Sequence, residues 1–414
     1  MQRRIMVIGA GFAGMWSALA AARLIDLHGG DIEVALVAPE PTLVMRPRLY
    51  EAHAAGMVSP LSALFAVTGV RYIQGSVETI CSGANEVAIA HAGGTRSVLS
   101  YDALILAAGS QLFRPDIPGL REFAFSIDQR DDAATLEAHC HALAQRPDTP
   151  ARNTVVIGGG GFTGIEIAAE MPARLRGILG PDAAIRAVVV EQAPEIGPDL
   201  GPGPRPVIQQ ALRDLGVETR LGSGIAAIDA DGVTTAAGER IETNTVVWTA
   251  GVRASPLAAQ VPGERDRLGR LMVDRTLRAP ATANVFAAGD TVCAATDDAG
   301  HRSLMSCQHA LLLGRCAGNN AVAQLLGIEP VPYSQVRYGT GLDLGPWGAV
   351  QTMGWERRIL TFGAEGKVRK RFVNGELIYP PRPDRAAAFA AADPAPSIAF
   401  YAKPVSDRAI ASQN

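Results

Sequence analysis

The feature that most constrains this fold is a glycine-rich pattern that occurs twice. The stretch IMVIGAGFAGMWSALAAA (residues 5–22) is an apolar run followed by spaced glycines and a helical pattern, and NTVVIGGGGFTGIEIAAEM (153–171) repeats it. Both copies contain the spacing Gly-x-Gly-x-x-Gly between a predicted strand and a predicted helix. Glycine at these places allows a tight turn, the close approach of a pyrophosphate, and close packing of helix on strand. The sequence therefore predicts two dinucleotide-binding folds.

Hydrophobic runs alternate with helical patterns along the chain, which is typical of parallel α/β architecture. We expect strands at 4–8, 32–38, 154–158 and 186–191, and helices at 12–27, 162–177 and 307–327. The predicted fold class is α/β, with two Rossmann-like dinucleotide-binding domains and a small C-terminal unit.

A linker near 145–152 (RPDTPARN) divides the two repeats. We expect a discontinuous first domain at 1–145 and 273–335, a second domain at 150–272 inserted into it, and a C-terminal unit at 336–414. The tail PDRAAAFAAADPAPS is low in complexity, and we expect it to be mobile.

Composition excludes several classes of protein. The chain is 48% hydrophobic and 19% charged with a net charge of -3, without the basic excess of a nucleic-acid binder. Its five cysteines are scattered and form no CxxC motif, so we expect a reduced, cytosolic protein without disulfides or a metal site. Arg3 and Arg4 before an apolar stretch imitate a signal peptide, but glycines interrupt that stretch. No run of about 18 apolar residues predicts a transmembrane helix.

In the first loop the three glycines are Gly9, Gly11 and Gly14, and the helix after them offers free N–H groups and a partial positive charge. An acidic residue at the end of the following strand normally binds the adenosine ribose. Here that strand ends in Ala38-Pro39, and the first acid is Glu40. Either Glu40 reaches the ribose, or it is a solvated turn residue.

In the second loop the best register is Gly159, Gly161 and Gly164, and the strand RAVVVEQ ends at Glu191. A carboxylate there can accept from both ribose hydroxyls and would repel a 2′-phosphate. No Arg or Lys stands beside Glu191, so NADH is favoured over NADPH.

Two acids, Glu166 and Glu170, follow the second loop on the predicted helix. Spacing i,i+4 also fits a solvated helix face. Because Glu166 lies in the first turn, we predict that it positions the nicotinamide.

Five motifs occur in one order: VIGAGFAGM, LILAAGSQ (104–111), VVIGGGGFTGIEIAAE, TVVWTAGVRASPL (245–257) and VFAAGD (285–290). Over residues 3–330 the chain resembles the FAD-dependent pyridine-nucleotide oxidoreductases, and among them the type II NADH dehydrogenases, which are single-subunit NADH:quinone oxidoreductases. WTAGVRASP is the more specific marker, because glycine loops alone are common.

The resemblance implies FAD at the first loop, at the turn Ala108-Gly109 and at Gly289-Asp290, where Asp290 accepts from the ribityl chain. It also places Gln308 and His309 at the start of a helix that points at the flavin; His309 could equally cap or pack that helix. We therefore predict Glu166, Gln308 and His309 as catalytic residues. The remaining candidate cofactor contacts are Phe12, Ala13, Arg46, Val77, Phe162, Thr163 and Gly251.

The acceptor side departs from the family pattern. The stretch SCQHALLLG keeps Gln308 but has Leu312 and Leu313 where the family carries a glutamine pair that helps to line the quinone pocket. The family's C-terminal amphipathic helices are replaced by GKVRKRFVNGELIYPPRPDR, whose basic cluster at 367–371 either touches anionic lipid or is solvated. The stretch PTLVMRPRLYEAHAAG has no cysteine, which argues against a disulfide reductase.

The function that we predict is an FAD-dependent NADH oxidoreductase that passes electrons to a quinone or another small acceptor. The alternatives are a soluble flavin reductase with a dedicated small-molecule or protein acceptor, and an NADH-sensing flavoprotein. We expect at most peripheral contact with the inner face of the membrane. The C-terminal unit, including YGTGLDLGPWGAVQTMGW (338–355), either covers the flavin or forms a homodimer interface.

Overall fold

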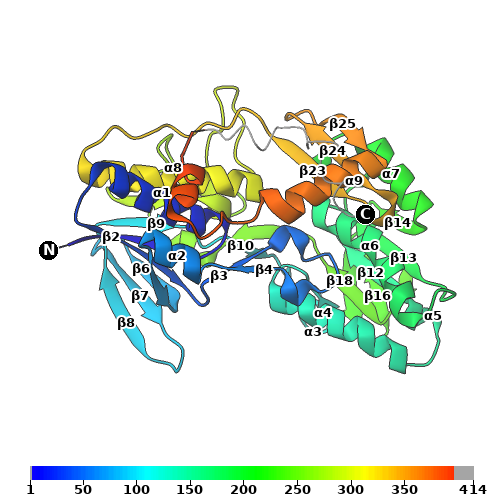
Figure 1. Cartoon of the computed structure of the whole chain (residues 1–414). Helices are drawn as coiled ribbons and strands as arrows, with labels where there is room; N and C mark the ends of the chain where they lie inside the picture. The colour runs from blue at the N-terminus through cyan, green and yellow to red at the C-terminus, as the bar shows by residue number, and fades with distance from the viewer. Residues whose placement is uncertain (1, 396–414) are drawn as a thin grey trace, which may run out of the picture.

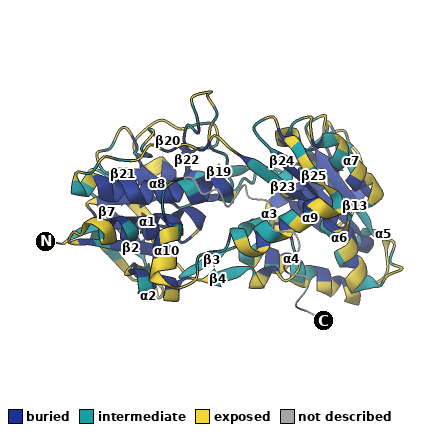
Figure 2. Ribbon diagram, turned by 45° about the horizontal axis from the view of Figure 1, so that its top comes forward, coloured by how far each residue is buried: buried dark blue, intermediate teal, exposed yellow. Residues whose placement is uncertain are grey.

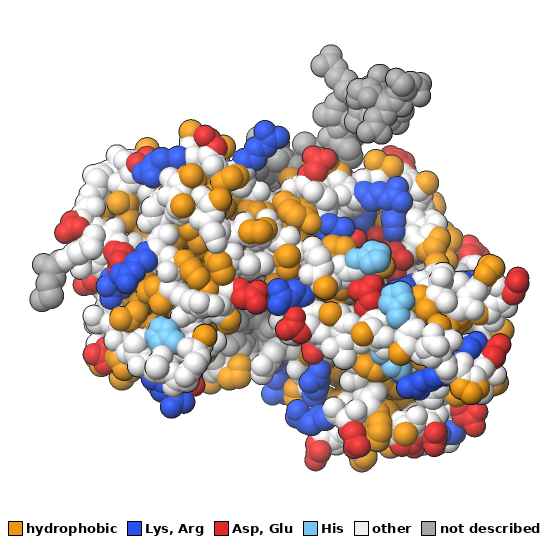
Figure 3. All heavy atoms as spheres, turned by 60° about the horizontal axis from the view of Figure 1, so that its bottom comes forward, with side chains coloured by type: hydrophobic (Ala, Val, Ile, Leu, Met, Phe, Trp, Pro, Cys, Tyr) orange, Lys and Arg blue, Asp and Glu red, His pale blue; other side chains and the backbone are white. Residues whose placement is uncertain are grey.

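Each glycine repeat opens a helix that packs on a parallel β-sheet, and the two sheets form the two halves of the molecule (Figure 1). The computed structural model describes residues 2–395. This arrangement confirms the predicted α/β class with two Rossmann-like sheets. The two halves meet at a hollow on the face shown in Figure 3.

The first half is built on a five-stranded parallel sheet whose spatial order is β21 (Val285–Ala287), β9 (Ala103–Leu106), β1 (Arg3–Ile8), β2 (Ile32–Ala38) and β5 (Arg71–Gln74). Helices α1 (Phe12–His28) and α8 (Cys307–Leu326) pack tightly against each other. A Cβ on Gly314 would lie 2.4 Å from the Ala13 carbonyl oxygen, and one on Gly318 would lie 2.0 Å from that of Ser17. Glycine therefore lets the backbones of α1 and α8 approach closely.

The second half has the same plan, in the order β11 (Ala124–Phe125), β18 (Thr245–Trp248), β12 (Thr154–Gly158), β13 (Arg186–Glu191) and β14 (Val217–Leu221). Its helices are α4 (Arg130–Ala142), α6 (Phe162–Leu179) and α7 (Arg205–Asp214). Since β11 and α4 precede residue 145, the second sheet and its covering helices begin before the predicted linker near 145–152. The edge strand β11 is only two residues long, which leaves little periodic signal in the sequence.

Two short strands carry the chain between the halves. Strand β10 (Ser110–Leu112) leaves the first half and pairs antiparallel with β19 (Val252–Ala254), which returns from the second. Gln111 lies opposite Arg253 in this pair.

Smaller elements complete the two halves. Their strands are β3 (Thr42–Val44), β4 (Val58–Pro60), β6 (Ser76–Cys81), β7 (Glu86–Ala90), β8 (Arg96–Ser100), β15 (Ile225–Asp229), β16 (Gly232–Thr235), β17 (Arg240–Glu242), β20 (Leu271–Met272) and β22 (Val292–Cys293). Their short helices are α2 (Ser62–Thr68), α3 (Leu120–Phe123) and α5 (Pro150–Asn153).

The C-terminal region does not form one unit. Strands β23 (Gly339–Asp343), β24 (Ala349–Met353) and β25 (Arg358–Phe362) and helix α9 (Gly363–Phe372) form a small layer against α6 of the second half. The chain then returns to the first half, where α10 (Arg385–Ala391) packs against α1 and α2. Part of the tail expected to be mobile is thus a docked helix, and residues 396–414 lie outside the described residues.

Buried residues make up most of the central strands of the two sheets (Figure 2), and their side chains form cores on both sheet faces. Along β12, Val155 and Ile157 belong to the core under α6, whereas Val156 belongs to the core on the opposite face. Strands buried on both faces read as continuous apolar runs, which is why the sequence locates them well. Within residues 2–395, no helix is both long and apolar enough to cross a membrane.

Candidate active site

The first glycine loop has the geometry of a pyrophosphate cradle. Gly9 has a φ of +106°, and a Cβ there would lie 2.5 Å from the Ala107 carbonyl oxygen. A Cβ on Gly14 would lie 1.9 Å from the carbonyl oxygen of Gly9, whereas a Cβ on Gly11 would meet nothing within 4 Å. Helix α1 begins at Phe12 without a side-chain cap or an acidic residue in its first turn. Open space therefore faces the free N–H groups and the positive end of the helix, and this arrangement fits a dinucleotide.

Asp290 lies in a polar cluster near this loop. Its carboxylate accepts a hydrogen bond of 2.6 Å from the Ser110 hydroxyl and lies 3.6 Å from the Arg46 guanidinium. Arg46 also pairs with Asp128, whose other oxygen accepts from the backbone N–H of Leu112. The structure thus brings two predicted residues, Arg46 and Asp290, together at the start of β10.

Glycines at 109 and 289 shape the same region. Both have positive φ, +69° and +74°, and a Cβ on Gly289 would lie 2.7 Å from the Cβ of Ala13. Val77 and Ala108 are partly buried against the first core. Glu40 is an exposed residue that pairs with Arg130 at 3.1 Å. Its contact with a ribose stays a prediction.

The second glycine loop repeats the cradle. Gly159 has a φ of +110°, and a Cβ on Gly164 would lie 1.9 Å from the Gly159 carbonyl oxygen. A Cβ on Gly161 would again meet nothing within 4 Å, and α6 begins at Phe162 without a side-chain cap. Thr163 is exposed in the first turn. Gly251, with a φ of +81°, follows β18 and lies beside Phe113.

Glu191 ends β13 next to this loop. Its two oxygens accept hydrogen bonds from the backbone N–H groups of Gly160, at 2.6 Å, and Ala193, at 2.8 Å. A carboxylate oxygen has further lone pairs, so Glu191 can still accept from a ribose hydroxyl. These two amides fix the carboxylate at the mouth of the second cradle.

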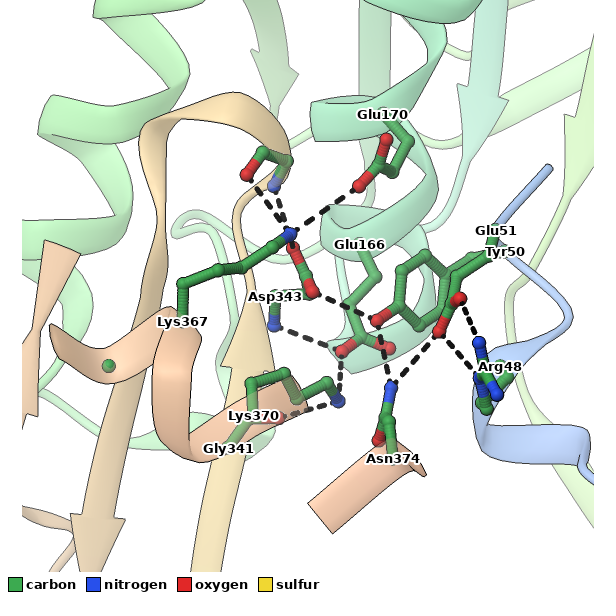
Figure 4. Close-up of polar contacts among 12 residues, drawn as sticks. Arg48, Tyr50, Glu51, Glu166, Glu170, Gly341, Asp343, Lys367, Lys370 and Asn374 are labelled. Atoms are coloured by element: carbon green, nitrogen blue, oxygen red, sulfur yellow. Dashed lines mark hydrogen bonds and ion pairs between the residues drawn. The ribbon is translucent and has the colours of Figure 1, made fainter. Parts of the chain in front are cut away.

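Glu166 is not on a solvated face, because it is only 4% exposed. Its carboxylate accepts hydrogen bonds from the Lys370 ammonium, at 2.8 Å, and from the backbone N–H of Asp343, at 3.0 Å (Figure 4). Burial raises the pKa of Glu166 to about 7, although the attraction of Lys370 acts in the opposite direction. Near neutral pH this carboxyl group can therefore hold or release a proton.

A wider polar network joins α6 to the C-terminal layer and to the 3-10 turn at 46–48 (Figure 4). Lys367 pairs with Asp343 and lies 3.7 Å from Glu170. The Tyr50 hydroxyl donates to Asp343 at 3.0 Å, and burial raises the pKa of Tyr50 well above its usual range. Burial likewise raises the pKa of Glu170.

Lys370 lies where the two halves meet. Its ammonium is 5.6 Å from the centre of the Tyr50 ring and 5.7 Å from that of Phe162, the first residue of α6. Burial raises the pKa of the Cys307 thiol to about 11, while the charges of Lys370 and Asp290 act on it in opposite directions. Lys370 is therefore close to the second loop, and its charge also acts on the thiol at the start of α8.

At the start of α8, Gln308 and His309 are both buried. The side-chain Oε1 atom of Gln308 accepts from the backbone N–H of Gly339, and the His309 Nδ1 atom lies 3.0 Å from the Ser306 hydroxyl. Burial lowers the pKa of His309 to about 3, so the imidazole is neutral at physiological pH. His309 thus does help to cap its helix through Ser306.

Aromatic rings from the C-terminal layer cover His309. The rings of Tyr338 and Trp355 lie 4.6 Å and 6.0 Å from the His309 ring, and the Arg357 guanidinium lies over Tyr338 at 4.7 Å. Three buried polar atoms in this cluster have no partner among the described residues: His309 Nε2, Trp355 Nε1 and Arg357 Nη1. Buried polar groups are usually hydrogen-bonded, so these atoms point to a missing partner such as water or a ligand.

Sequence reasoning missed the role of Lys370. The basic cluster was expected to touch lipid or water, but Lys370 is only 6% exposed and is the partner of Glu166. A signal was present, because Lys367 and Lys370 are three residues apart and match the spacing of Glu166 and Glu170 on a helix. Tyr50, Asp343 and Trp355 carried no comparable signal.

The chain matches the model of the pyridine nucleotide-disulphide oxidoreductase family over residues 3–314. It belongs to this family. This membership makes the protein an oxidoreductase and confirms the resemblance drawn from its motifs. It also agrees with the two glycine cradles described above.

Individual proteins resemble this chain more specifically than the family model does. The chain is 44% identical to an NADH dehydrogenase-like protein of Mycobacterium tuberculosis, over 94% of this chain and 98% of that one. It is 29% identical to the type II NADH:quinone oxidoreductase NdhA of the same species, over 70% of this chain and 66% of that one. The fold matches that of NDH2 from Plasmodium falciparum in complex with NADH, with a TM-score of 0.77, 14% identity and coverage of 94% and 97%.

Proposed function

We propose that this protein is an FAD-dependent NADH oxidoreductase that passes electrons to a small acceptor, for which a quinone is the first candidate. The observation that carries the proposal is the pair of matched cradles, one in each half, with Gly11 and Gly161 each facing open space at a helix start. FAD in the first cradle would take a hydride from NADH in the second and pass electrons onward.

The chain's own residues supply binding and positioning. The helix starts at Phe12 and Phe162 would bind the two pyrophosphates. Asp290, oriented by Ser110 and Arg46, would accept from a hydroxyl of the flavin side chain. Glu191 would accept from the NADH ribose, and its negative charge supports NADH over NADPH.

Glu166 is proposed to position the nicotinamide end of NADH. Glu166 follows the first turn of α6 rather than lying in it as predicted, and its contact with Lys370, whose ammonium lies near Phe162, supports this role. With Lys370 it would also hold a proton at the junction of the two halves, because its pKa is near neutrality. The C-terminal layer excludes water from this carboxylate through α9 and β23.

A quinone is proposed as the acceptor by analogy to relatives. Type II NADH:quinone oxidoreductases among the relatives support a quinone. A dedicated polar acceptor is the second candidate, because His309, Trp355 and Arg357 each leave a polar atom without a partner beside Gln308. Such a lining would bind an acceptor through its oxygen atoms.

The test is anaerobic stopped-flow absorbance of the FAD-loaded protein. NADH is expected to bleach the flavin rapidly, and a soluble quinone added next is expected to restore the colour. Absence of bleaching by NADH would refute the proposed function. Rapid bleaching with slow recovery on quinone would refute the quinone and favour the dedicated polar acceptor.

A variant pair tests the role of Glu166. Glu166→Gln is expected to weaken NADH binding or slow bleaching, whereas Glu329→Gln, an exposed acid far along the chain, is expected to behave as the parent protein. Equal rates in both variants would contradict the assignment of Glu166.

A further inference from the structure

An arginine-lined pocket lies where the strand pair β10–β19 joins the two halves. Its volume is about 340 Å³. The residues that line it are Gln111, Leu112, Phe113, Arg114, Arg121 and Arg253. Neither glycine loop contributes a lining residue, so this pocket is separate from the two cradles.

The pocket carries a strong local excess of positive charge. The guanidinium group of arginine is a planar cation with five N–H donors. Within residues 2–395, Arg121 and Arg253 form no ion pair with a carboxylate. Arg114 has one carboxylate nearby, that of Asp132, at 3.8 Å. Among the described residues, the three guanidinium groups thus have one carboxylate nearby, that of Asp132 beside Arg114.

The backbone and the aromatic ring fix part of this arrangement. The Arg253 guanidinium lies over the Phe113 ring at 4.2 Å, and Arg121 donates to the carbonyl oxygen of Arg114 at 3.4 Å. Phe113 donates its N–H to Gly251 and accepts from Trp248, so the wall of the pocket is bound to the end of β18. These contacts join Arg121 and Arg253, whose residues are exposed, to the Phe113 and Arg114 wall of the pocket.

We propose that this pocket binds the phosphate groups of a small phosphorylated molecule with at least two negative charges, such as a pyrophosphate ester. A guanidinium offers two parallel N–H donors that match two oxygens of a phosphate. Three such groups around one space neutralise a multiply charged anion and repel a cation. A neutral ligand would gain nothing from their charge. The volume is in the range of small-molecule sites, about 300–1,000 Å³.

The pocket is connected to the cofactor side. Gln111 and Leu112 follow Ser110, which donates to Asp290, and the Leu112 N–H donates to Asp128, the partner of Arg46. A ligand in the pocket therefore contacts the strand that carries the proposed FAD contacts, although it binds outside the cradles.

Titration calorimetry of the full-length, FAD-loaded protein with inorganic pyrophosphate tests the proposal, at constant ionic strength set with NaCl. The parent protein is expected to bind one pyrophosphate. Arg121→Gln and Arg253→Gln are each expected to weaken binding about tenfold, because each removes one charge-assisted contact. Arg253→Lys, which keeps the charge but loses the fork, is expected to fall between the parent and Arg253→Gln.

Arg176→Gln is the matched control, because Arg176 is exposed on α6 of the same half and outside the pocket. It is expected to bind pyrophosphate like the parent, and the FAD content of each variant checks folding. A repeat with saturating NAD⁺ separates the sites, and the dissociation constant is expected to stay unchanged. Absence of binding, equal loss in the control, or competition by NAD⁺ would each overturn the proposal, and competition would assign the anion to the cofactor cradle.

Discussion

Alanine substitutions at two glycines of the second cradle should have different effects, one mainly on the stability of the protein and the other mainly on NADH binding. A Cβ on Gly164 would lie 1.9 Å from the Gly159 carbonyl oxygen, whereas real contacts of a Cβ are essentially never under 3.0 Å. In Gly164→Ala the start of α6 must therefore move away from the loop by about 1.1 Å, the difference between 3.0 Å and 1.9 Å. Overpacking of this kind costs about 1–3 kcal/mol of stability.

Gly161→Ala is the contrasting change. Its Cβ meets nothing within 4 Å, so the protein itself loses only about 0.5–1 kcal/mol, through the poorer helix cap. The methyl group would, however, occupy the space that a pyrophosphate needs to reach the N–H groups of α6. Loss of one hydrogen bond to a charged group costs about 1.5–3 kcal/mol, or about a 10- to 150-fold weaker NADH affinity.

Thermal unfolding and NAD⁺ titration of the same samples distinguish the two variants. Thermal unfolding of the FAD-loaded protein should rank Gly164→Ala clearly below Gly161→Ala, and titration with NAD⁺ should show weak binding for both. Gly11→Ala, the twin of Gly161→Ala in the first loop, should lose FAD instead. If Gly161→Ala bound NAD⁺ as tightly as the parent, the second loop would not be a pyrophosphate site and the reasoning would be wrong.

Three further predictions concern the polar groups of the site. Because burial raises the pKa of Glu166 from 4.5 to about 7, its contribution to stability is fully present below pH 4.5 and is lost as the pH rises through 7, with a slope of at most about 1.4 kcal/mol per pH unit. Urea unfolding between these pH values should show that slope in the parent and not in Glu166→Gln; identical pH profiles would contradict it. Lys370→Met should destabilise the protein by about 3–5 kcal/mol because it leaves a buried carboxylate without its partner, and adding Glu166→Gln should restore part of the loss. Strictly additive effects in this cycle would show that the pair does not interact. Arg46→Ala should lower the FAD content of the purified protein, because Arg46 lies beside Asp290, whereas Arg96→Ala, at the exposed ion pair with Glu78, should not; equal FAD content would remove Arg46 from the site.

The parallel strands and the helices that follow the glycine loops could be predicted from the sequence for a physical reason. Strands such as β12 are buried on both faces, so they appear as continuous apolar runs next to glycine turns. The helix expected at 162–177 extends over Phe162–Leu179, and the one expected at 307–327 over Cys307–Leu326. A side chain at Gly14 or Gly164 would clash with the carbonyl oxygen of the first glycine of the same loop, so few other residues fit at these two positions.

The sequence predicts residues of the candidate site only where a single strand–turn–helix unit contains them. The cradles come from single strand–turn–helix units, and the sequence locates their residues. The partner of Glu166 comes from Lys370, 204 residues further on, and no local pattern links two residues at that separation. The same holds for the rings of Tyr338 and Trp355 over His309, which depend on how the C-terminal layer folds back.

The course of the chain between the halves sets an order of assembly during synthesis. The second sheet takes all its strands from residues 124–248, one uninterrupted stretch, so it can form while the ribosome is still at work. The first sheet stays without its edge strand until residues 285–287 have emerged, and α10, at 385–391, closes it last. Pairings over such distances close slowly and leave apolar strands uncovered meanwhile. A nascent chain would therefore hold a finished second sheet beside an open first sheet, before the C-terminal layer is added to α6, and the first cradle would be completed after the second.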